Sequence, residues 1–284
     1  MKAITVSRLR YKGSKLLLSG RKKLYQTLLA NGLPRSILFI VGCQRSGTSI
    51  MQIVFKHDLN TRSFEEFSEL SSNDHKSRIR LNSLELVEKE FSKVKASFIV
   101  AKPLVESQNI LRLLDYFHNS KAVWLFRNYR GVALSNIKYF GIQNGIEDLR
   151  PIVGNQPRDW RSEKVSKHVQ ETISKYFSED MNPHDAAVLF WFARNSLYFD
   201  LELHKDPRVL LCAYEDFVLD PDKNIKNIYR HVGQVYPKKN ITAAVHSNSR
   251  KNGQDLELSP EIENLAQELQ DRLESAYRAK TLPD

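Results

Sequence analysis

Small, hydroxyl and basic side chains gather in one short stretch near the start of the chain. The stretch reads Gly42-Cys43-Gln44-Arg45-Ser46-Gly47-Thr48-Ser49. Five apolar residues precede it and predict a buried strand, and the apolar spacing after Gly47 predicts a helix. In such a strand–loop–helix unit, backbone N–H groups and the positive end of the helix converge on one point. The pattern therefore predicts a phosphate-binding loop.

The spacing of this loop nearly matches the nucleoside-triphosphate motif G-x4-G-K-[ST], but Thr48 stands where that motif needs a lysine. The basic residue lies inside the loop instead, at Arg45. We therefore expect a loop for a single phosphate group. The alternative is a glycine turn that only joins a strand to a helix, and the crowding of hydroxyl and basic residues argues against it.

Two further cationic residues, Lys102 and Arg127, each follow directly on a short apolar run. Ligands of parallel α/β sheets bind beyond the carboxyl ends of the strands, so Arg45, Lys102 and Arg127 should face one crevice. Ser135 follows Arg127 by eight residues, on the second turn of the next expected helix. This pair is expected to hold a second phosphate, away from the first loop. Taken alone, an arginine paired with a surface acid and a serine on a helix face would be the better explanation, but together with the first loop the pair indicates a nucleotide phosphorylated at two places.

The elements that must position these side chains alternate along the chain. Short apolar runs predict strands at 37–41, 98–101, 122–126 and 209–212. Helical spacing predicts helices near 47–57, 78–94, 107–117, 130–140, 185–204, 221–232 and 259–280. This alternation predicts an α/β fold, a single P-loop-like domain with a central, mainly parallel sheet flanked by helices. Residues 61–73 are expected to be a polar connection. Residues 141–183 are a candidate lid or insertion, with a helix around 163–178.

The formal charge of +10 is concentrated at the N-terminus, because residues 1–36 hold nine basic residues and no acidic residue. The chain therefore divides into a basic arm or helix, 1–36, and an α/β domain, 37–284. The charge of the arm suits a contact with anionic lipid at a membrane, with another polyanion or with an acidic partner. The alternative, which we favour, is a leader helix that packs on the domain through leucines, namely Leu16, Leu17, Leu24, Leu28 and Leu29.

The cysteines and the lack of long apolar runs bear on the cellular location of the protein. Cys43 and Cys212 are expected to be buried free thiols, because two cysteines beside apolar runs do not make a disulfide framework. No apolar run is long enough to span a membrane, and the N-terminus lacks the features of a secretory signal. The expected location is cytoplasmic, with or without a peripheral membrane contact, and no nucleic-acid partner is predicted.

Four segments resemble the sulfotransferase family that uses 3′-phosphoadenosine 5′-phosphosulfate (PAPS), including its bacterial and Golgi-type, protein-tyrosine and carbohydrate branches. The 42–49 loop resembles the family's 5′-phosphosulfate loop, G-x-P-R-S-G-T-[TS], with Gln44 in place of the proline. The segment from Arg127 to Ser135 resembles its 3′-phosphate motif. Lys102-Pro103 resembles its lysine turn, and Tyr214-Glu215-Asp216-Phe217 with Asp220-Pro221 resembles its Y-E-D-L…D-P segment. Order and spacing agree from about residue 36 to 235.

The resemblance implies a role for each matching residue. The 5′-phosphosulfate would be held by Arg45, Ser46, Gly47, Thr48 and Ser49. The 3′-phosphate would be held by Arg127 and Ser135, and Tyr214 would lie beside the adenosine. Tyr139 occupies a position where some relatives have a second arginine, and neighbouring Lys138 is a candidate substitute. Further nucleotide contacts fall near Ser247 and Lys251.

For the chemistry, the resemblance implies transfer of the sulfonyl group from PAPS, with 3′-phosphoadenosine 5′-phosphate (PAP) as the product and no metal. Lys102 and Arg45 would neutralise developing charge. Some relatives carry a glutamate base about twenty residues beyond the loop arginine, which selects Glu66 or its neighbour Glu65, and we favour Glu66. His118 is a further alternative.

The acceptor implied by the resemblance is a hydroxyl or amine of a glycan, a lipid or a small metabolite, and the sequence does not choose among them. Two other functions remain open: a nucleoside or small-molecule kinase, and a non-catalytic nucleotide-binding module. The oligomeric state is not predicted.

Overall fold

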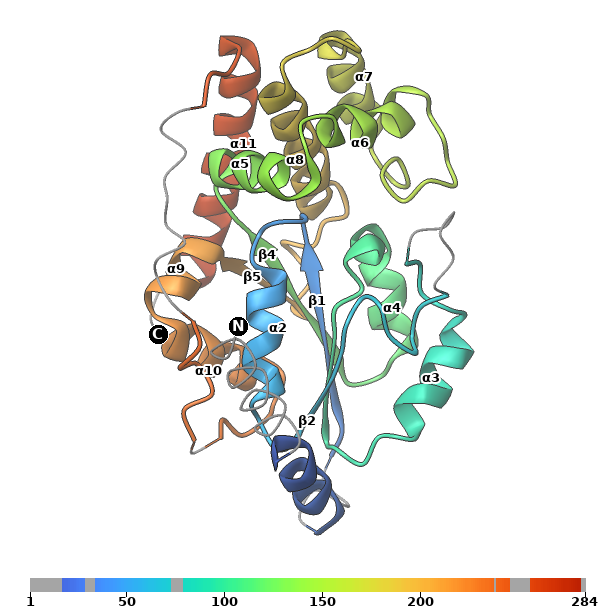
Figure 1. Cartoon of the computed structure of the whole chain (residues 1–284), viewed down its shortest axis with the longest axis vertical. Coiled ribbons are helices and arrows are strands. Elements are labelled where there is room, and N and C mark those ends of the chain that lie inside the picture. Colours follow the sequence, from blue (N-terminus) through green and yellow to red (C-terminus); the bar gives the residue numbers. More distant parts are fainter. Residues whose placement is uncertain (1–16, 29–33, 73–78, 238, 246–255, 282–284) are drawn as a thin grey trace, which may run out of the picture.

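A computed structural model describes residues 17–28, 34–72, 79–237, 239–245 and 256–281 of the chain. At its centre lies one five-stranded sheet in the order β2-β3-β1-β4-β5 (Figure 1). The strands are β1 (Ser36–Gly42), β2 (Thr61–Phe64), β3 (Phe98–Ala101), β4 (Ser120–Phe126) and β5 (Val209–Ala213). Every neighbouring pair is parallel, so all five carboxyl ends meet at one edge of the sheet.

Helices cover both faces of the sheet and extend beyond its carboxyl edge (Figure 1). The first helix spans residues 17–28. The remaining helices are α2 (Thr48–Lys56), α3 (Leu84–Ser92), the 3-10 helix η1 (Leu104–Asn109), α4 (Ile110–Tyr116), α5 (Tyr129–Phe140), α6 (Asn144–Val153), α7 (Lys167–Tyr176), α8 (Pro183–Asp200), α9 (Tyr214–Leu219), α10 (Pro221–His231) and α11 (Pro260–Thr281). The arrangement is the α/β fold with a central parallel sheet that the sequence predicts.

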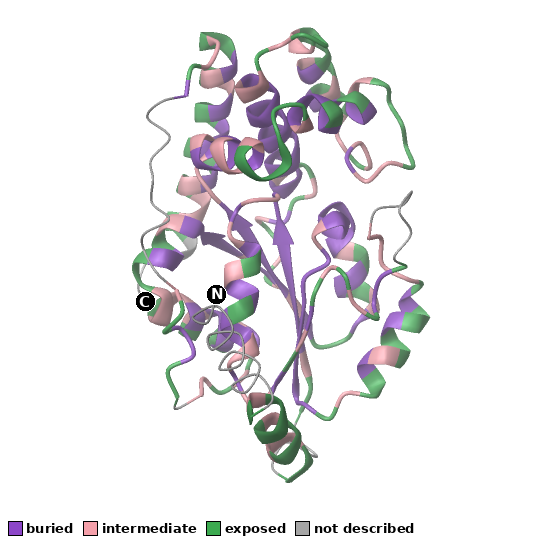
Figure 2. Cartoon of the chain, viewed as in Figure 1, coloured by how far each residue is buried: buried purple, intermediate pink, exposed green. Residues whose placement is uncertain are grey.

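Alternate residues of the strands divide between two hydrophobic cores. On β1, Leu38 and Ile40 face the core shared with α2, α9 and α10. Ile37, Phe39 and Val41 face the core shared with α3, α4, α8 and α11. This alternation follows from the period of two residues in an extended strand. Because both faces are covered, the central strands are mostly apolar, and Figure 2 shows them as largely buried.

The connections on either side of β1 run in opposite directions across the sheet. The chain leaves β1 for β2 and β3 on one side, and then crosses to β4 and β5 on the other. A crevice forms beyond the carboxyl ends where the direction of winding reverses. The loop after β1 lies at this point.

Strand β2 is absent from the sequence prediction, which expected a polar connection over 61–73. It pairs with β3 in parallel, with Thr61 opposite Phe98 and Phe64 opposite Ala101. As an edge strand it buries only its first and last residues, so it lacks the continuous apolar run that marks the central strands.

The segment 141–183 contains two helices rather than one. Helix α7 corresponds to the predicted helix, and α6 is additional. Ile146, Leu149 and Ile152 of α6 are buried in the same core as α8. Gly145 and Pro151 concealed this helix in the sequence, although a Cβ at Gly145 would lie only 2.7 Å from the backbone nitrogen of Ala187. Close packing of α6 on α8 therefore needs the glycine. The proposed lid role of the segment remains a prediction.

The helix of residues 17–28 does not pack through the three predicted leucines that lie within it, contrary to the interpretation we favour from sequence. Leu17, Leu24 and Leu28 are 71%, 63% and 67% exposed. The helix instead contacts the domain through polar side chains: Lys22 Nζ donates to the Thr61 carbonyl at 2.8 Å, and Gln26 Nε2 donates to the Leu59 carbonyl at 2.9 Å. Leu16, Leu29 and the basic residues before 17 lie outside the described residues.

Two smaller expectations can also be compared with the structure. Cys43 and Cys212 are buried free thiols, as predicted, and burial raises the pKa of the Cys43 thiol to about 12. None of the described helices is long and apolar enough to cross a bilayer.

Candidate active site

The 42–49 loop joins β1 to α2. At two of its positions, Gly42 and Gly47, the backbone conformation and the close neighbours leave no room for a side chain. Gly42 and Gly47 have φ angles of 129° and 94°, in the left-handed region. A Cβ on Gly42 would lie 2.3 Å from the Leu125 carbonyl oxygen, and a Cβ on Gly47 would lie 2.3 Å from the Tyr214 ring. The glycines therefore allow the loop to lie against β4 and against Tyr214 at once.

The loop presents unsatisfied polar groups at the start of α2. The Ser46 hydroxyl is fully buried and has no hydrogen-bond partner among the described residues. The first turn of α2 carries no acidic residue, and its N-terminal residue, Gly47, offers no side-chain cap. Within the described residues, neither a cap nor a first-turn acid offsets the partial positive charge of this helix end, which favours an anion.

Lys102 reaches this helix end from β3. Its side chain is 7% exposed, and Nζ donates to the Ser49 hydroxyl at 3.0 Å. The Phe64 carbonyl accepts from the Lys102 backbone N–H at 3.2 Å, which fixes the residue at the end of β2. Lys102 thus supplies, from a neighbouring strand, the ammonium group that the loop lacks at Thr48.

Arg127 and Ser135 lie on the other side of the loop, in contact with Arg45. Arg45 Nε donates to the Ser135 hydroxyl at 3.1 Å, and Arg127 Nη1 approaches the Arg45 carbonyl at 3.4 Å. Arg45 has a left-handed φ of 66°, which turns its side chain out of the loop towards α5. The expected second site is therefore not separate from the loop, because Arg45 belongs to both.

Several contacts position Arg127. Trp191 of α8 donates to the Arg127 carbonyl at 2.9 Å, and the guanidinium lies over the Tyr214 ring at 4.5 Å. Gly131 leaves room for this side chain, because a Cβ there would lie 2.9 Å from Arg127 Nε.

The two arginines form an electropositive cluster. Burial lowers the pKa of the Arg45 guanidinium, and the nearby charge of Arg127 lowers it further. Arg45 also stacks on the Tyr139 ring, with its guanidinium carbon 4.1 Å from the ring centre. An anion between Arg45 and Arg127 would relieve their repulsion.

The structure distinguishes the candidate bases. Glu66 lies 3.3 Å from Lys102 Nζ, and its side chain is 21% exposed. Glu65 points to the surface, where it is 58% exposed and pairs with Lys56. His118 is exposed and precedes β4, at the end of the sheet opposite to these groups. Of the three, only Glu66 meets the other site residues.

These groups share one cavity of about 430 Å³. Of the residues to which the sequence assigns a preferred role, all except buried Ser46 line it, namely Arg45, Gly47, Thr48, Ser49, Glu66, Lys102, Arg127, Ser135 and Tyr214. The alternatives Lys138, Glu65 and His118 do not line it. The rest of the lining consists of Gly42, Gln44, Ile50, Phe67, Ile79, Leu104, Val105, Tyr139, Phe140, Asn144, Asp148, Trp160 and Arg194. Ser247 and Lys251 lie outside the described residues.

Asp148 of α6 is a site residue that the sequence reasoning missed. It accepts from Gln44 Nε2 at 2.9 Å and from Arg161 Nε at 2.6 Å. Burial is the largest influence and raises the pKa of Asp148, although the Arg161 charge opposes it. Gln44, at the position where the motif G-x-P-R-S-G-T-[TS] has proline, thus links the loop to α6. Asn144 Nδ2 donates to Asp148 at 2.8 Å. Once 144–153 is recognised as a helix, the spacing of four residues places Asn144 and Asp148 on one face, and this is the signal that could have identified Asp148.

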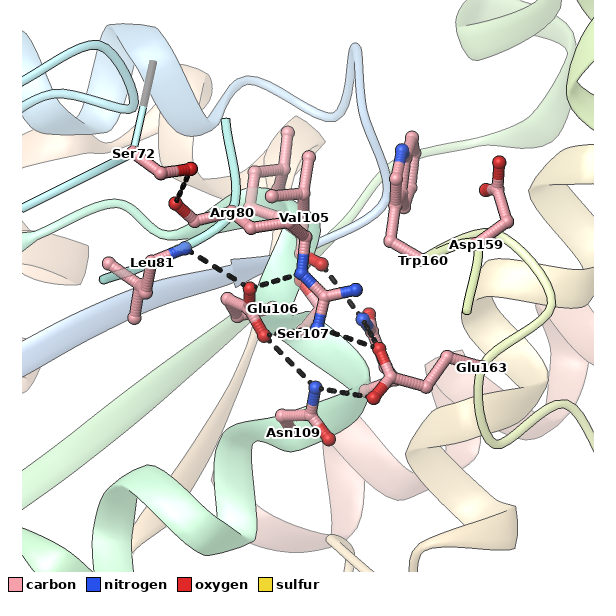
Figure 3. A network of polar contacts seen from close by, with 12 residues as sticks. Ser72, Arg80, Leu81, Val105, Glu106, Ser107, Asn109, Asp159, Trp160 and Glu163 are labelled. Carbon is pink, nitrogen blue, oxygen red and sulfur yellow. Dashed lines mark hydrogen bonds and ion pairs between the residues drawn. The ribbon is translucent and has the colours of Figure 1, made fainter. Parts of the chain in front are cut away.

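A second polar group, the Glu106 cluster, consists of Arg80, Glu106, Asn109 and Glu163 (Figure 3). Arg80 Nε donates to Glu106 Oε1 at 2.5 Å, and Arg80 Nη2 lies 2.9 Å from Glu163 Oε2. The Asn109 amide bridges both carboxylates at 2.9 and 3.1 Å. The cluster fastens the segment after residue 78 to η1 and to the 159–163 segment, so it holds three walls of the cavity together.

Comparisons with known proteins place the chain in a family. A family profile described as a sulfotransferase domain matches residues 35–278. The sulfotransferase domain of a Synechococcus olefin synthase is 16% identical, with 89% of this chain and 98% of that chain covered and a TM-score of 0.49. A sulfotransferase domain of the curacin biosynthetic pathway is 14% identical, with 84% and 98% covered and a TM-score of 0.48.

A sulfotransferase from Alicyclobacillus acidocaldarius is 13% identical, with 89% of this chain and 98% of that chain covered and a TM-score of 0.46. No curated protein matches the chain. Because these structural likenesses are weak, the family profile alone carries the assignment.

Proposed function

Because this chain belongs to the sulfotransferase domain family, we propose that it moves the sulfonyl group of PAPS to a hydroxyl or amine of an acceptor. The observation that carries the proposal is the meeting of three groups at the start of α2. Lys102 contacts both Ser49 of the 42–49 loop and Glu66, so a cation, a phosphate-type loop and a carboxylate adjoin.

The residues present fit the donor. The 5′-phosphosulfate would lie at the start of α2, where the unpaired Ser46 hydroxyl and the uncapped helix end favour an anion. Arg127 and Ser135 would hold the 3′-phosphate, beside Arg45. Tyr214, stacked under Arg127, would border the adenosine.

Most of the catalysis in such a transfer comes from positioning and charge stabilisation. When bound, PAPS supplies the sulfonyl group and leaves as PAP. A bond forms between the acceptor oxygen and sulfur, and the bond between sulfur and the bridging phosphate oxygen breaks. Lys102 would stabilise the charge that develops on that bridging oxygen, and Arg45 would stabilise the departing phosphate.

Glu66 is the proposed general base. It would accept the proton of the acceptor hydroxyl as the new bond to sulfur forms. Its place beside Lys102 puts the proton acceptor and the stabilising cation on the same side of the 42–49 loop. No metal takes part in this proposal.

Binding of PAP, measured by thermal shift and by calorimetry, tests the nucleotide site. We expect PAP to stabilise the protein, and Arg127→Ala to weaken PAP binding by about tenfold to a hundredfold, because a charge-assisted phosphate contact is lost. Arg112→Ala, on the exposed face of α4, is the matched control and should bind PAP normally. Absence of PAP binding together with magnesium-dependent ATP hydrolysis would contradict the proposal and favour a kinase.

A further inference from the structure

Residues that follow different strands line the two sides of the cavity. Arg127, Ser135 and Tyr214 follow β4 and β5, whereas Glu66 and Lys102 follow β2 and β3. The 42–49 loop after β1 lies between them, because β1 is the central strand. If the nucleotide occupies the β4–β5 side, as proposed above, the β2–β3 side remains for the acceptor, with Glu66 at its inner end.

Apolar side chains form the walls of the β2–β3 side. Phe67 follows Glu66, Ile79 begins the described range 79–237, and Leu104 and Val105 lie on η1, just after Lys102. Trp160 closes this side from the segment between α6 and α7. The Glu106 cluster holds Ile79, η1 and the 159–163 segment together, so these walls are fixed relative to one another (Figure 3).

The mouth of the cavity also carries exposed aromatic rings. Phe67 is 66% exposed, and Tyr139 and Phe140 at the end of α5 are 67% and 46% exposed. All three line the cavity. Ile142, two residues beyond Phe140, is 59% exposed as well. Large apolar side chains gathered around one opening are typical of a binding site for an apolar ligand.

The cationic side chains on the β2–β3 side, Lys102 and Arg194, already have partners among the described residues. Lys102 pairs with Glu66 at 3.3 Å. Arg194 is 1% exposed, and its two terminal nitrogens donate to the Trp160 carbonyl and to Gln108 Oε1 at 3.1 and 2.8 Å. Lys102 is thus shared between Ser49 and Glu66, and Arg194 is too deeply buried to meet a carboxylate or sulfate on an acceptor. An acidic glycan would therefore lose its hydration here without compensation.

We propose that the acceptor is a hydroxyl group carried by an uncharged, apolar body, either an aliphatic alcohol or a phenol. The apolar body would contact Phe67, Leu104, Val105 and Trp160, and its hydroxyl would lie beside Glu66. This inference rests on the proposed function.

A panel of acceptors tests the inference, with PAPS as the donor and release of PAP as the readout. Octanol represents aliphatic alcohols, naphthol represents phenols, and an uronic-acid disaccharide represents acidic glycans. We expect octanol or naphthol to be at least about tenfold better in kcat/KM than the disaccharide. A second readout is thermal stabilisation of the PAP-loaded protein by octanol or naphthol.

Substitutions in the apolar wall test whether it binds the acceptor. Phe67→Ala and Leu104→Ala should each raise KM for the better apolar acceptor by about fivefold to tenfold, because apolar contact is lost. Both should bind PAP as the unaltered protein does. Leu86→Ala is the matched control, because Leu86 is 51% exposed on α3 and does not line the cavity.

Two outcomes overturn the inference and leave the proposed function intact. One is PAP binding with transfer to the disaccharide and not to the apolar acceptors. The other is PAP binding with neither transfer to octanol or naphthol nor stabilisation by them. Failure to bind PAP at all contradicts the proposed function itself.

Discussion

Glu65 and Glu66 illustrate how much depends on the direction of one side chain. They are sequence neighbours of the same chemistry, and their spacing from Arg45 does not separate them. The structure separates the two glutamates, because β2 ends at Phe64 and the next two side chains point in different directions. Glu65 joins Lys56 on the surface, and Glu66 joins Lys102 in the cavity.

Paired substitutions test which glutamate is the base. Glu66→Gln should lower kcat by at least about a hundredfold, the usual contribution of a general base, and leave PAP binding unchanged. Glu65→Gln should stay within about twofold, since it removes only an exposed ion pair. The measurement is transfer from PAPS to the best acceptor of the panel, with PAP binding as the control for folding. A fully active Glu66→Gln protein would refute the assignment, most directly if Glu65→Gln were inactive.

At the scale of elements, the strand–loop–helix unit places the site, and its geometry depends on Gly47. This residue combines a left-handed φ of 94° with a Tyr214 ring that occupies the position of a Cβ. The chain offers controls that separate these two causes. Gly233 has a left-handed φ of 70° and open space around it, and Gly20 has open space in the exposed helix of residues 17–28.

Gly47→Ala should therefore destabilise the protein most, by about 2–4 kcal/mol, and should also weaken PAP binding. Gly233→Ala should cost about 1 kcal/mol from backbone strain alone. Gly20→Ala should be neutral or stabilising by up to about 1 kcal/mol, because alanine is the better helix former. Urea unfolding gives the free energies, and calorimetry with PAP gives the binding. Equal costs at Gly47 and Gly233 would show that the Tyr214 contact is unimportant.

The elements also show what sequence can predict and why. β1, β3 and β4 are buried on both faces, so their apolar runs identify them, and Lys102 and Arg127 follow at their ends as predicted. β2 and α6 are different. β2 is an edge strand and is only partly buried, so it lacks a continuous apolar run. α6 contains Gly145 and Pro151, which usually indicate a break in a helix; Gly145 is needed here because α8 packs closely against it. The sequence reasoning missed Asp148 and the Glu106 cluster for this reason, because these residues reach the cavity only through tertiary packing.

At the scale of the whole molecule, the two ends of the sheet carry different surfaces. The cavity lies at the carboxyl ends of the strands, and the helix of residues 17–28 lies at the opposite end (Figure 1). There Lys22 contacts Thr61, the first residue of β2. Figure 2 shows this helix as mostly exposed.

The exposed face of this helix combines leucines with cations. Leu17, Leu24 and Leu28 lie at intervals of seven and four residues, which places them on one stripe, and Arg21 falls within it. Lys22 is not part of this face. Burial lowers its pKa to about 8, and it is bonded to Thr61. Apolar side chains interspersed with exposed cations are the pattern of a helix that lies on an anionic membrane surface.

We therefore expect the full chain to sediment with vesicles that contain anionic lipid, to release as salt rises, and to ignore neutral vesicles. Replacing Leu17, Leu24 and Leu28 together by alanine should weaken vesicle binding by about tenfold or more, since the insertion of apolar side chains is lost. PAP binding should not change, because the helix and the cavity lie at opposite ends of the sheet. Leu219→Ala is a suitable control, since Leu219 is 62% exposed on α9. Equal binding to neutral and anionic vesicles would refute the electrostatic part of this prediction, and no binding to either would refute it entirely.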